Sequence, residues 1–233
     1  MQQVRSSPVE RLLGLLFPDR CIGCRLRGVV LCEACAADVP RLGGEVCPLC
    51  AAPSRLARIC QRCRAKPMTL DGVRAACHFD GAVRTAIHDL KYRGIRSRAG
   101  LLASFVAEAV EARPLAVDVL VPVPLAPARR RQRGFNQSEL LATAVSARLG
   151  VSLLASGLTR IRETPRQVGR SASERQTNVV GAFACQNGEG IVGRRVAVVD
   201  DVMTTGATLS ACAEALKQAG ASRVYGIVVA REG

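Results

Sequence analysis

From about residue 72 onward, short apolar runs alternate with longer stretches in which apolar residues recur at helical spacing. Residues 117–121 are apolar apart from one aspartate, which is typical of a strand buried on both faces. Asn136 is a suitable N-cap with Glu139 three residues later, so a helix is expected to begin there. The whole pattern predicts strands at 72–79, 117–121, 195–199 and 222–230, and helices at 82–92, 101–112, 136–149 and 207–219. Because helices join these strands, the expected fold class is α/β, with a mostly parallel sheet flanked by helices on both faces.

The first 70 residues lack this alternation of strand and helix patterns and are rich in cysteine. Eight of the eleven cysteines form four CxxC pairs, separated by short loops rich in Gly, Pro and Ala. A CxxC turn directs two thiolates toward one point, and two such turns complete a tetrahedral zinc site, which replaces missing apolar burial. We therefore expect an N-terminal helix and a double zinc ribbon over 1–70, ahead of a second domain over 71–233. The expected ligands are Cys21, Cys24, Cys32, Cys35, Cys47, Cys50, Cys60 and Cys63.

Eight ligands with no open coordination position favour two structural zinc ions over a catalytic one. Sequential pairing, first pair with second and third with fourth, is the simpler arrangement, and interleaved pairing stays open. A disulfide framework would need an oxidising compartment, for which the sequence offers no persuasive export signal. A thioredoxin-like centre would need one CxxC at the start of a helix beside a strand. Cys77, Cys185 and Cys212 stand alone and are expected to be small buried side chains.

One strand-to-helix junction carries clear ligand chemistry. The apolar run that ends at Val199 is followed by Asp200 and Asp201, and then by a Thr-Thr-Gly-Ala-Thr segment that leads into a helix. Free backbone N–H groups and the helix dipole favour a phosphate at such a terminus, and the glycine allows close approach. The two carboxylates suit ribose hydroxyls. The P-loop signature of nucleoside triphosphatases is absent, and a capped turn with two surface aspartates is the plain alternative.

The net charge and the composition limit the classes of binding partner that we expect. Lys plus Arg total 33 against 19 Asp plus Glu, a formal net charge of +14, which suits a nucleic acid, a membrane surface or a phosphate-rich substrate. Arginines scattered along the whole chain also fit an arginine-rich proteome. Aromatic residues make up 3% with no Trp, which disfavours a platform for stacking bases. The apolar run 12–17 is too short to span a bilayer and no later run spans one either, so we expect a soluble, cytoplasmic protein with no membrane span.

The junction resembles the phosphoribosyl pyrophosphate (PRPP) motif of type I phosphoribosyltransferases, which has four apolar residues, two acidic residues and a short loop rich in Thr and Gly. In that family the acidic pair holds the ribose hydroxyls and the loop holds the 5′-phosphate. The resemblance implies the first role for Asp200 and Asp201, and the second for Thr204, Thr205, Gly206, Ala207 and Thr208. It also implies Mg²⁺, which arrives with PRPP and bridges its ribose and pyrophosphate oxygens.

Nearly the whole chain, residues 21–230, resembles the ComF family of zinc-ribbon phosphoribosyltransferase-like proteins. The four CxxC pairs are followed in the family's order by the segments 87–94 (IHDLKYRG), 121–125 (VPVPL) and 133–137 (RGFNQ). Some members act in natural competence, in the cytoplasmic handling of incoming single-stranded DNA, and another branch is tied to carbohydrate use. The resemblance implies PRPP, single-stranded DNA and a competence helicase as partners, and a homodimer is expected for the fold.

Further roles come from the same resemblance. The loop after strand 117–121 occupies the pyrophosphate position of the type I enzymes, where Arg129 and Arg133 would stabilise charge on the leaving group, with a solvated basic surface as the alternative. Lys91 follows a helix that the family places near the ligand, and is expected to reach a phosphate. The polar stretch 162–178 lies where the family carries its mobile lid. The expected lid contacts are Arg162, Gln167, Arg175 and Asn178.

Three functions stay open. An enzyme would transfer the ribosyl phosphate of PRPP to an unidentified nucleophile, in competence or in nucleotide metabolism, mostly by positioning and electrostatics, and no residue is assigned as catalytic. A non-catalytic accessory module would use the fold as a scaffold, while the ribbons and the basic surface engage DNA or a protein. A sensor would bind PRPP without turnover.

Overall fold

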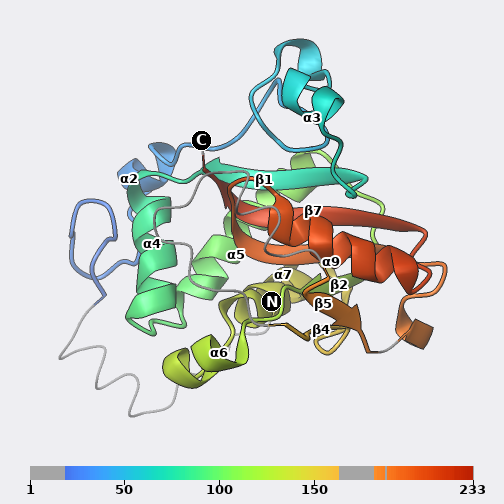
Figure 1. The fold of residues 1–233 in the computed structure, drawn as a ribbon. Coiled ribbons are helices and arrows are strands. Elements are labelled where there is room, and N and C mark those ends of the chain that lie inside the picture. The colour runs from blue at the N-terminus through green and yellow to red at the C-terminus, as the bar shows by residue number, and fades with distance from the viewer. Residues whose placement is uncertain (1–18, 163–180, 187, 233) are drawn as a thin grey trace.

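The computed structural model describes residues 19–162, 181–186 and 188–232 (Figure 1). Within them a five-stranded sheet has the order β1-β7-β6-β2-β3, and every neighbouring pair is parallel. The strands are β1 (Gly72–His78), β2 (Val119–Pro122), β3 (Ser152–Leu153), β6 (Arg195–Met203) and β7 (Arg223–Arg231). The middle strands are nearly continuous apolar runs because helices cover both faces.

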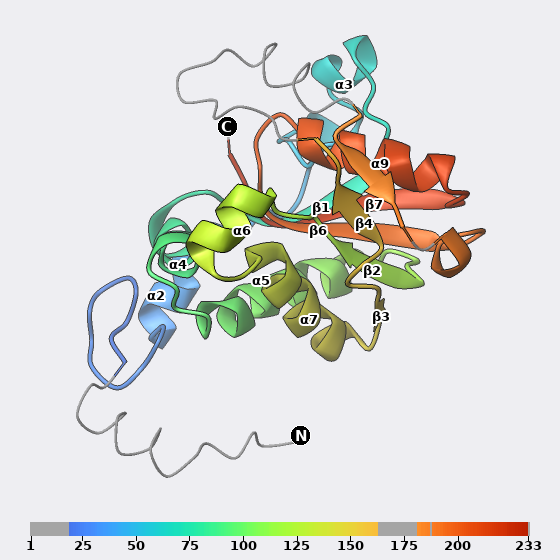
Figure 2. The same cartoon turned by 60° about the horizontal axis from the view of Figure 1, so that its bottom comes forward.

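Helices α4 (Gly81–Tyr92), α5 (Arg98–Ala112) and α7 (Gln137–Leu149) cover one face of the sheet, and α9 (Ala207–Gln218) covers the other (Figure 2). Alternate residues of a strand point to opposite faces, and β6 divides its side chains in that way. Ala197 and Val199 pack in the core beneath α4, α5 and α7, whereas Val196 and Val198 pack in the core beneath α9. The predicted α/β class with helices on both faces is confirmed.

Two differences from the expected elements bear on the site. Strand β6 continues past Val199 to Met203, so the acidic pair belongs to the strand itself, because β7 pairs with β6 as far as Met203. The segment expected to be a pyrophosphate loop contains a helix, α6 (Pro127–Arg133). Proline at the first helical position and Gly134 in the left-handed conformation after the last one are common start and stop signals, and the sequence interpretation missed both.

A second, smaller sheet was not predicted. Strands β4 (Leu158–Arg160) and β5 (Phe183–Cys185) pair antiparallel and contact α9. They flank the stretch 163–180, which lies outside the described residues. Strands of three residues carry too little alternation to be identified from sequence. A 3₁₀ turn, η2 (Gly188–Gly190), precedes β6.

The Cys-rich segment contains only short elements: α2 (Glu33–Ala37), the 3₁₀ turn η1 (Arg55–Ala57) and α3 (Gln61–Ala65). Its first part packs Ile22 and Val39 into the core beneath α4 and α5. Its second part contributes Cys47, Cys50 and Cys63 to the core beneath α9. The division of the chain at residue 70 stays a prediction, and the helix expected at 12–17 lies outside the described residues.

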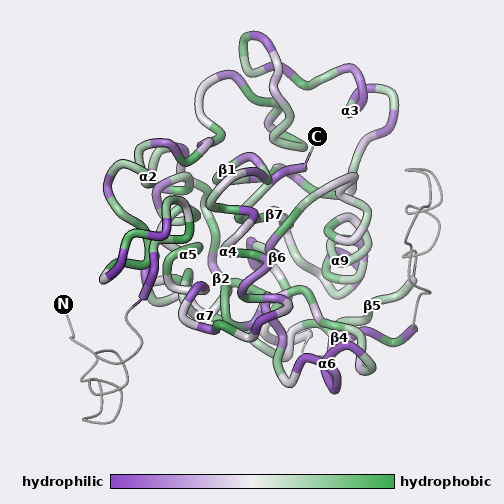
Figure 3. The backbone as a smooth tube through the Cα atoms, turned by 90° about the vertical axis from the view of Figure 1, so that its left-hand side faces the viewer, coloured by the Kyte–Doolittle hydropathy of each residue, from purple (hydrophilic) through white to green (hydrophobic). Residues whose placement is uncertain are grey.

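Hydropathy follows this arrangement. Figure 3 shows hydrophilic residues along α6, where the sequence reads PARRRQR and none of the side chains is buried. Among the described helices none is both long and apolar enough to cross a membrane.

Candidate functional site

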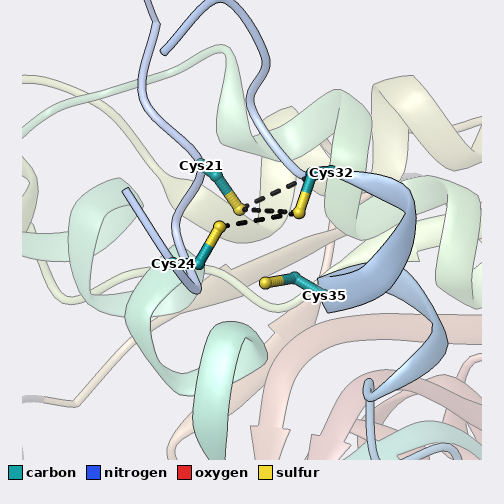
Figure 4. Close-up of side chains that lie close together, drawn as sticks. All are labelled: Cys21, Cys24, Cys32 and Cys35. Atoms are coloured by element: carbon teal, nitrogen blue, oxygen red, sulfur yellow. Dashed lines mark hydrogen bonds between the residues drawn. The ribbon is translucent and has the colours of Figure 1, made fainter. Parts of the chain in front are cut away.

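The eight cysteines of the CxxC pairs form two clusters of four. The first joins Cys21, Cys24, Cys32 and Cys35 (Figure 4), and the second joins Cys47, Cys50, Cys60 and Cys63; within each, all sulfur atoms lie within 4.8 Å of one another. The pairing is therefore sequential. Four sulfurs placed 2.3 Å from a tetrahedral zinc ion would lie about 3.8 Å apart. The Cys24–Cys32 and Cys50–Cys60 sulfur distances of 3.6 and 3.7 Å fit that geometry.

The electrostatics of the first cluster also fit a divalent cation. Hydrogen bonds from backbone N–H groups, that of Cys32 foremost, lower the pKa of Cys21 to about 6. Hydrogen bonding to the Cys32 and Cys21 sulfurs raises the pKa of Cys35 to about 12, because four thiolates cannot ionise together without a counter-charge. Two structural zinc ions would supply that charge and hold loops that have little apolar burial of their own.

The Thr-rich segment forms a cradle between β6 and α9. Gly206 is the N-cap of α9 with φ 81°, a left-handed conformation that favours glycine. A Cβ atom there would also lie 2.6 Å from the sulfur of Met68. The hydroxyl of Thr205 accepts a hydrogen bond from the Ala207 N–H at 3.3 Å. A cavity of about 120 Å³ is lined by Asp200 and by Val202 to Leu209, so the structure brings together the residues predicted to hold the 5′-phosphate and one of the predicted ribose carboxylates.

The acidic pair lies at the same end of β6, with partners from two helices. Lys91 of α4 forms an ion pair with Asp201, whose side chain is 4% exposed, at 2.7 Å from nitrogen to oxygen. The Ser138 hydroxyl of α7 donates to Asp200 at 2.8 Å, and the Asp201 N–H donates to the same oxygen at 2.9 Å. Lys91 thus lies against the site, although its contact is a carboxylate rather than the predicted phosphate.

Burial and charge set the protonation of these groups. Burial, followed by the neighbouring charge of Asp201, raises the pKa of Asp200 to about 7, although Lys91 and Ser138 oppose the rise. Burial has the largest single effect on Lys91 and would lower its pKa, but the charge and hydrogen bond of Asp201, together with the charge of Asp200, outweigh it and the pKa is raised. The site therefore holds a lysine whose charged form is favoured and one carboxyl, that of Asp200, whose pKa lies near neutral pH.

The predicted arginines are spread along α6. Arg133, at its end, donates to the Gln137 side chain and lies over the Tyr92 ring at 5.7 Å. Arg133 is close enough to Asp201 for its pKa to respond to that charge, although burial has the larger effect and lowers it. Arg129 is exposed and lies within electrostatic range of Arg133. Placing these two in a loop was wrong, and their contact with pyrophosphate stays a prediction.

Of the four predicted lid residues, only Arg162 lies within the described part of the chain. Arg162 is exposed at the end of the described segment, just after β4. Gln167, Arg175 and Asn178 lie outside the described residues. Their roles stay predictions.

The structure adds residues that sequence reasoning missed. Asn136 caps α7 by accepting from the Ser138 N–H at 3.0 Å, and its amide donates to the Val123 carbonyl at 3.0 Å, which fixes the loop after β2. The RGFNQ segment was recognised, but only its role as a helix start was assigned. Arg62 and Met68, from the Cys-rich segment, touch the cradle at Thr205 and Gly206, and no local signal could have shown these long-range contacts.

Comparisons with known proteins agree with this construction. Residues 12–64 match the model of the double zinc ribbon domain, and residues 135–233 match that of the phosphoribosyl transferase domain. The "DNA utilization protein YhgH" of Salmonella typhi is 32% identical over 90% of this chain and 96% of its own length. The "Competence protein F" of Haemophilus influenzae is 29% identical over 89% and 95%. A solved glutamine PRPP amidotransferase from B. subtilis aligns at 22% identity over 57% of this chain and 26% of its own, with a TM-score of 0.40.

Proposed function

This chain belongs to the ComF family, with a double zinc ribbon and a phosphoribosyltransferase fold, and from that membership and the site geometry we propose that it binds PRPP at the carboxyl end of β6. The observation that carries the proposal is the junction itself: an acidic pair leads, within one strand end, into a phosphate cradle at a helix N-terminus. Asp200 and Asp201 would accept the ribose hydroxyls, and residues 204–208 would hold the 5′-phosphate. Mg²⁺ would arrive with PRPP.

Calorimetric titration with PRPP and Mg²⁺ tests this binding. Asp200→Asn combined with Asp201→Asn should abolish binding while zinc content stays at two ions per chain. Asp118→Asn is a matched control, because Asp118 is half-buried and pairs with Arg195 at the opposite end of the sheet. Unchanged affinity in the double variant would contradict the proposed site.

We further propose that the site can transfer the ribosyl phosphate. The bond from C1 to the pyrophosphate oxygen would break, a nucleophile would bond to C1 from the other face, and its proton would pass to solvent. Lys91 and Arg133 would stabilise the departing pyrophosphate, so catalysis rests on positioning and charge. Pyrophosphate release, measured with nucleobases, ammonia and single-stranded DNA as acceptors, tests the reaction. Complete silence would leave a protein that senses PRPP without turnover.

A second candidate function, the handling of single-stranded nucleic acid, is favoured by the outer surface of α4. Tyr92 is 71% exposed, and its ring lies 5.3 Å from that of His88, which lies 6.1 Å from Phe79. Arg25 and Arg84 line a cavity of about 550 Å³ beside this row, and no described carboxylate pairs with either. Composition disfavoured a stacking platform, yet the fold gathers two rings of α4 and the ring of Phe79, just before this helix, in one row. Stacking rings beside unpaired cations suit a single strand.

Fluorescence anisotropy with labelled single-stranded DNA over a salt series tests this second function. Binding should weaken steeply with salt, and Tyr92→Ala with Arg84→Gln should reduce it at least tenfold. Tyr225→Ala with Arg223→Gln makes the same changes on β7, away from α4, and should have little effect. Negligible binding at low salt would exclude the function. The relatives named for DNA utilization and competence support the handling of single-stranded DNA. The zinc sites need reduced thiolates, and this need supports a cytoplasmic location for the protein. A competence helicase and a second copy of the chain are further proposed partners, to be tested by co-purification and sedimentation.

A further inference from the structure

The second zinc ribbon lies against the phosphate cradle. Arg62, which stands between the ligands Cys60 and Cys63 in α3, donates from its guanidinium to the Thr205 carbonyl at 3.3 Å, across 143 residues of sequence. Met68, just after the ribbon, packs its sulfur where a Cβ on Gly206 would be. The central peptide of the cradle is therefore contacted by the ribbon on its carbonyl side.

The ribbon is itself fixed on the sheet, so Arg62 does not reach the cradle from a free loop. The buried side chain of Arg231, at the end of β7, donates to the Cys50 carbonyl at 3.0 Å. The Val73 N–H donates to the Pro48 carbonyl at 2.9 Å. Zinc at the second cluster would hold α3 in this place, because the Cys60 and Cys63 thiolates on either side of Arg62 are two of its ligands.

The contact has two consequences for an anion in the cradle. A trans peptide directs its C=O and its N–H in opposite directions, so the bond from Arg62 to the Thr205 carbonyl directs the Gly206 N–H away from the ribbon. Arg62 is exposed, and no described carboxylate neutralises it. This guanidinium, on the carbonyl side of the peptide, also adds positive charge near the helix terminus that would hold a phosphate.

We infer that Arg62 is a positioning residue of the 5′-phosphate site, which orients the Thr205–Gly206 peptide and is itself held in place by the zinc ion of the second ribbon. The inference rests on the proposed binding of PRPP. The ligand class is a phosphate monoester on a ribose, so PRPP and ribose 5-phosphate should both depend on Arg62. Free pyrophosphate, which lacks that group, should not.

Titrations with PRPP, ribose 5-phosphate and pyrophosphate, each with Mg²⁺, test the role of Arg62 in the zinc-loaded full chain. Losing a hydrogen bond to a charged group corresponds to about a ten- to hundredfold loss of affinity. Arg62→Gln should cause that loss for PRPP and ribose 5-phosphate, and leave pyrophosphate unchanged. Arg64→Gln, on the same short helix and also exposed, is the matched control. Equal losses for all three ligands, or the same effect from Arg64→Gln, would reduce Arg62 to a general surface charge and overturn the inference.

The role of zinc has its own readout, because coupling between two sites is reciprocal. Saturating ribose 5-phosphate should slow the transfer of one of the two zinc ions to a chromogenic chelator and leave the other unchanged. Arg62→Gln should abolish that protection while its zinc content and melting temperature stay those of the wild type. Equal release of both ions with and without ligand would show that the ribbon does not hold Arg62 for the phosphate. A wild-type protein that binds neither PRPP nor ribose 5-phosphate would instead refute the proposed function.

Discussion

Replacing Asp200 by asparagine should make the ligand-free protein more stable at pH 8 while removing PRPP binding. The carboxyl lies partly buried at the end of β6, and burial, then the charge of Asp201, raises its pKa to about 7. An asparagine oxygen can still accept from the Ser138 hydroxyl and the Asp201 N–H, which now donate at 2.8 and 2.9 Å. The substitution therefore removes charge with little change of shape.

The sign follows from the two states of the chain. The unfolded carboxyl loses its proton near pH 3.8, whereas the folded one keeps it until about pH 7. A raised folded pKa means that wild-type stability falls between about pH 4 and pH 7, and the loss is complete above that range. One pKa unit is worth about 1.4 kcal/mol, which sets an upper limit of about 4 kcal/mol for Asp200 at pH 8. Because the side chain keeps some contact with solvent, we expect a gain of roughly 1–3 kcal/mol.

Urea denaturation of wild type and Asp200→Asn at pH 5, 6, 7 and 8, with zinc present and PRPP absent, measures the effect. The difference in free energy of unfolding should grow with pH and level off above pH 7. Asp118→Asn provides a control of opposite sign. Hydrogen bonds from Arg195 lower the pKa of Asp118 to about 2, so its contribution is lost only as the pH falls toward that value. Relative to wild type, Asp118→Asn should have a lower free energy of unfolding, by a similar amount at every pH in the series.

Either of two results would contradict a gain in stability that comes from the removed charge. In the first result, Asp200→Asn is no more stable than wild type at pH 8. In the second, its gain in free energy of unfolding is the same at pH 5 as at pH 8. The first result would mean that the carboxylate is well solvated at the end of β6. The second would mean that the gain comes from packing rather than from charge.

Three further predictions concern the same site. Lys91→Met leaves Asp201 buried without its partner and should cost roughly 2–3 kcal/mol in urea denaturation; an unchanged midpoint would show that another cation replaces it. Gly206→Ala forces a side chain into the left-handed conformation against Met68, so stability should fall by about 1–2 kcal/mol and calorimetry should show weaker PRPP binding. Removing both zinc ions with a strong chelator should lower the melting temperature and abolish PRPP binding; a metal-free chain that still binds PRPP with full affinity would contradict the coupling.

The parts predicted well from the sequence are those in which neighbouring residues act together. The cradle at 204–208 is one continuous segment, and its strand, glycine and helix are each recognisable locally. The CxxC pairs carry their geometry in their spacing, and only the pairing needed the fold. By contrast, the bond from Arg62 to Thr205 joins elements far apart in the chain, as does the ion pair between Lys91 and Asp201. Long-range contacts of single side chains leave no periodicity to read.

The distribution of charge around the site supports PRPP over a nucleotide whose phosphates lie in one run. PRPP carries phosphates at both ends of a ribose, so a matching site needs anion-binding groups at two ends and acceptors for hydroxyls between them. The cradle with Arg62 supplies one set of such groups, and Lys91 and Arg133, which both act on Asp201, supply another. Asp200 lines the cradle cavity and Asp201 pairs with Lys91, so one lysine faces two carboxylates. The cation that PRPP carries would balance the remaining negative charge. A contiguous triphosphate would place its charge against that acidic centre, where like charges repel.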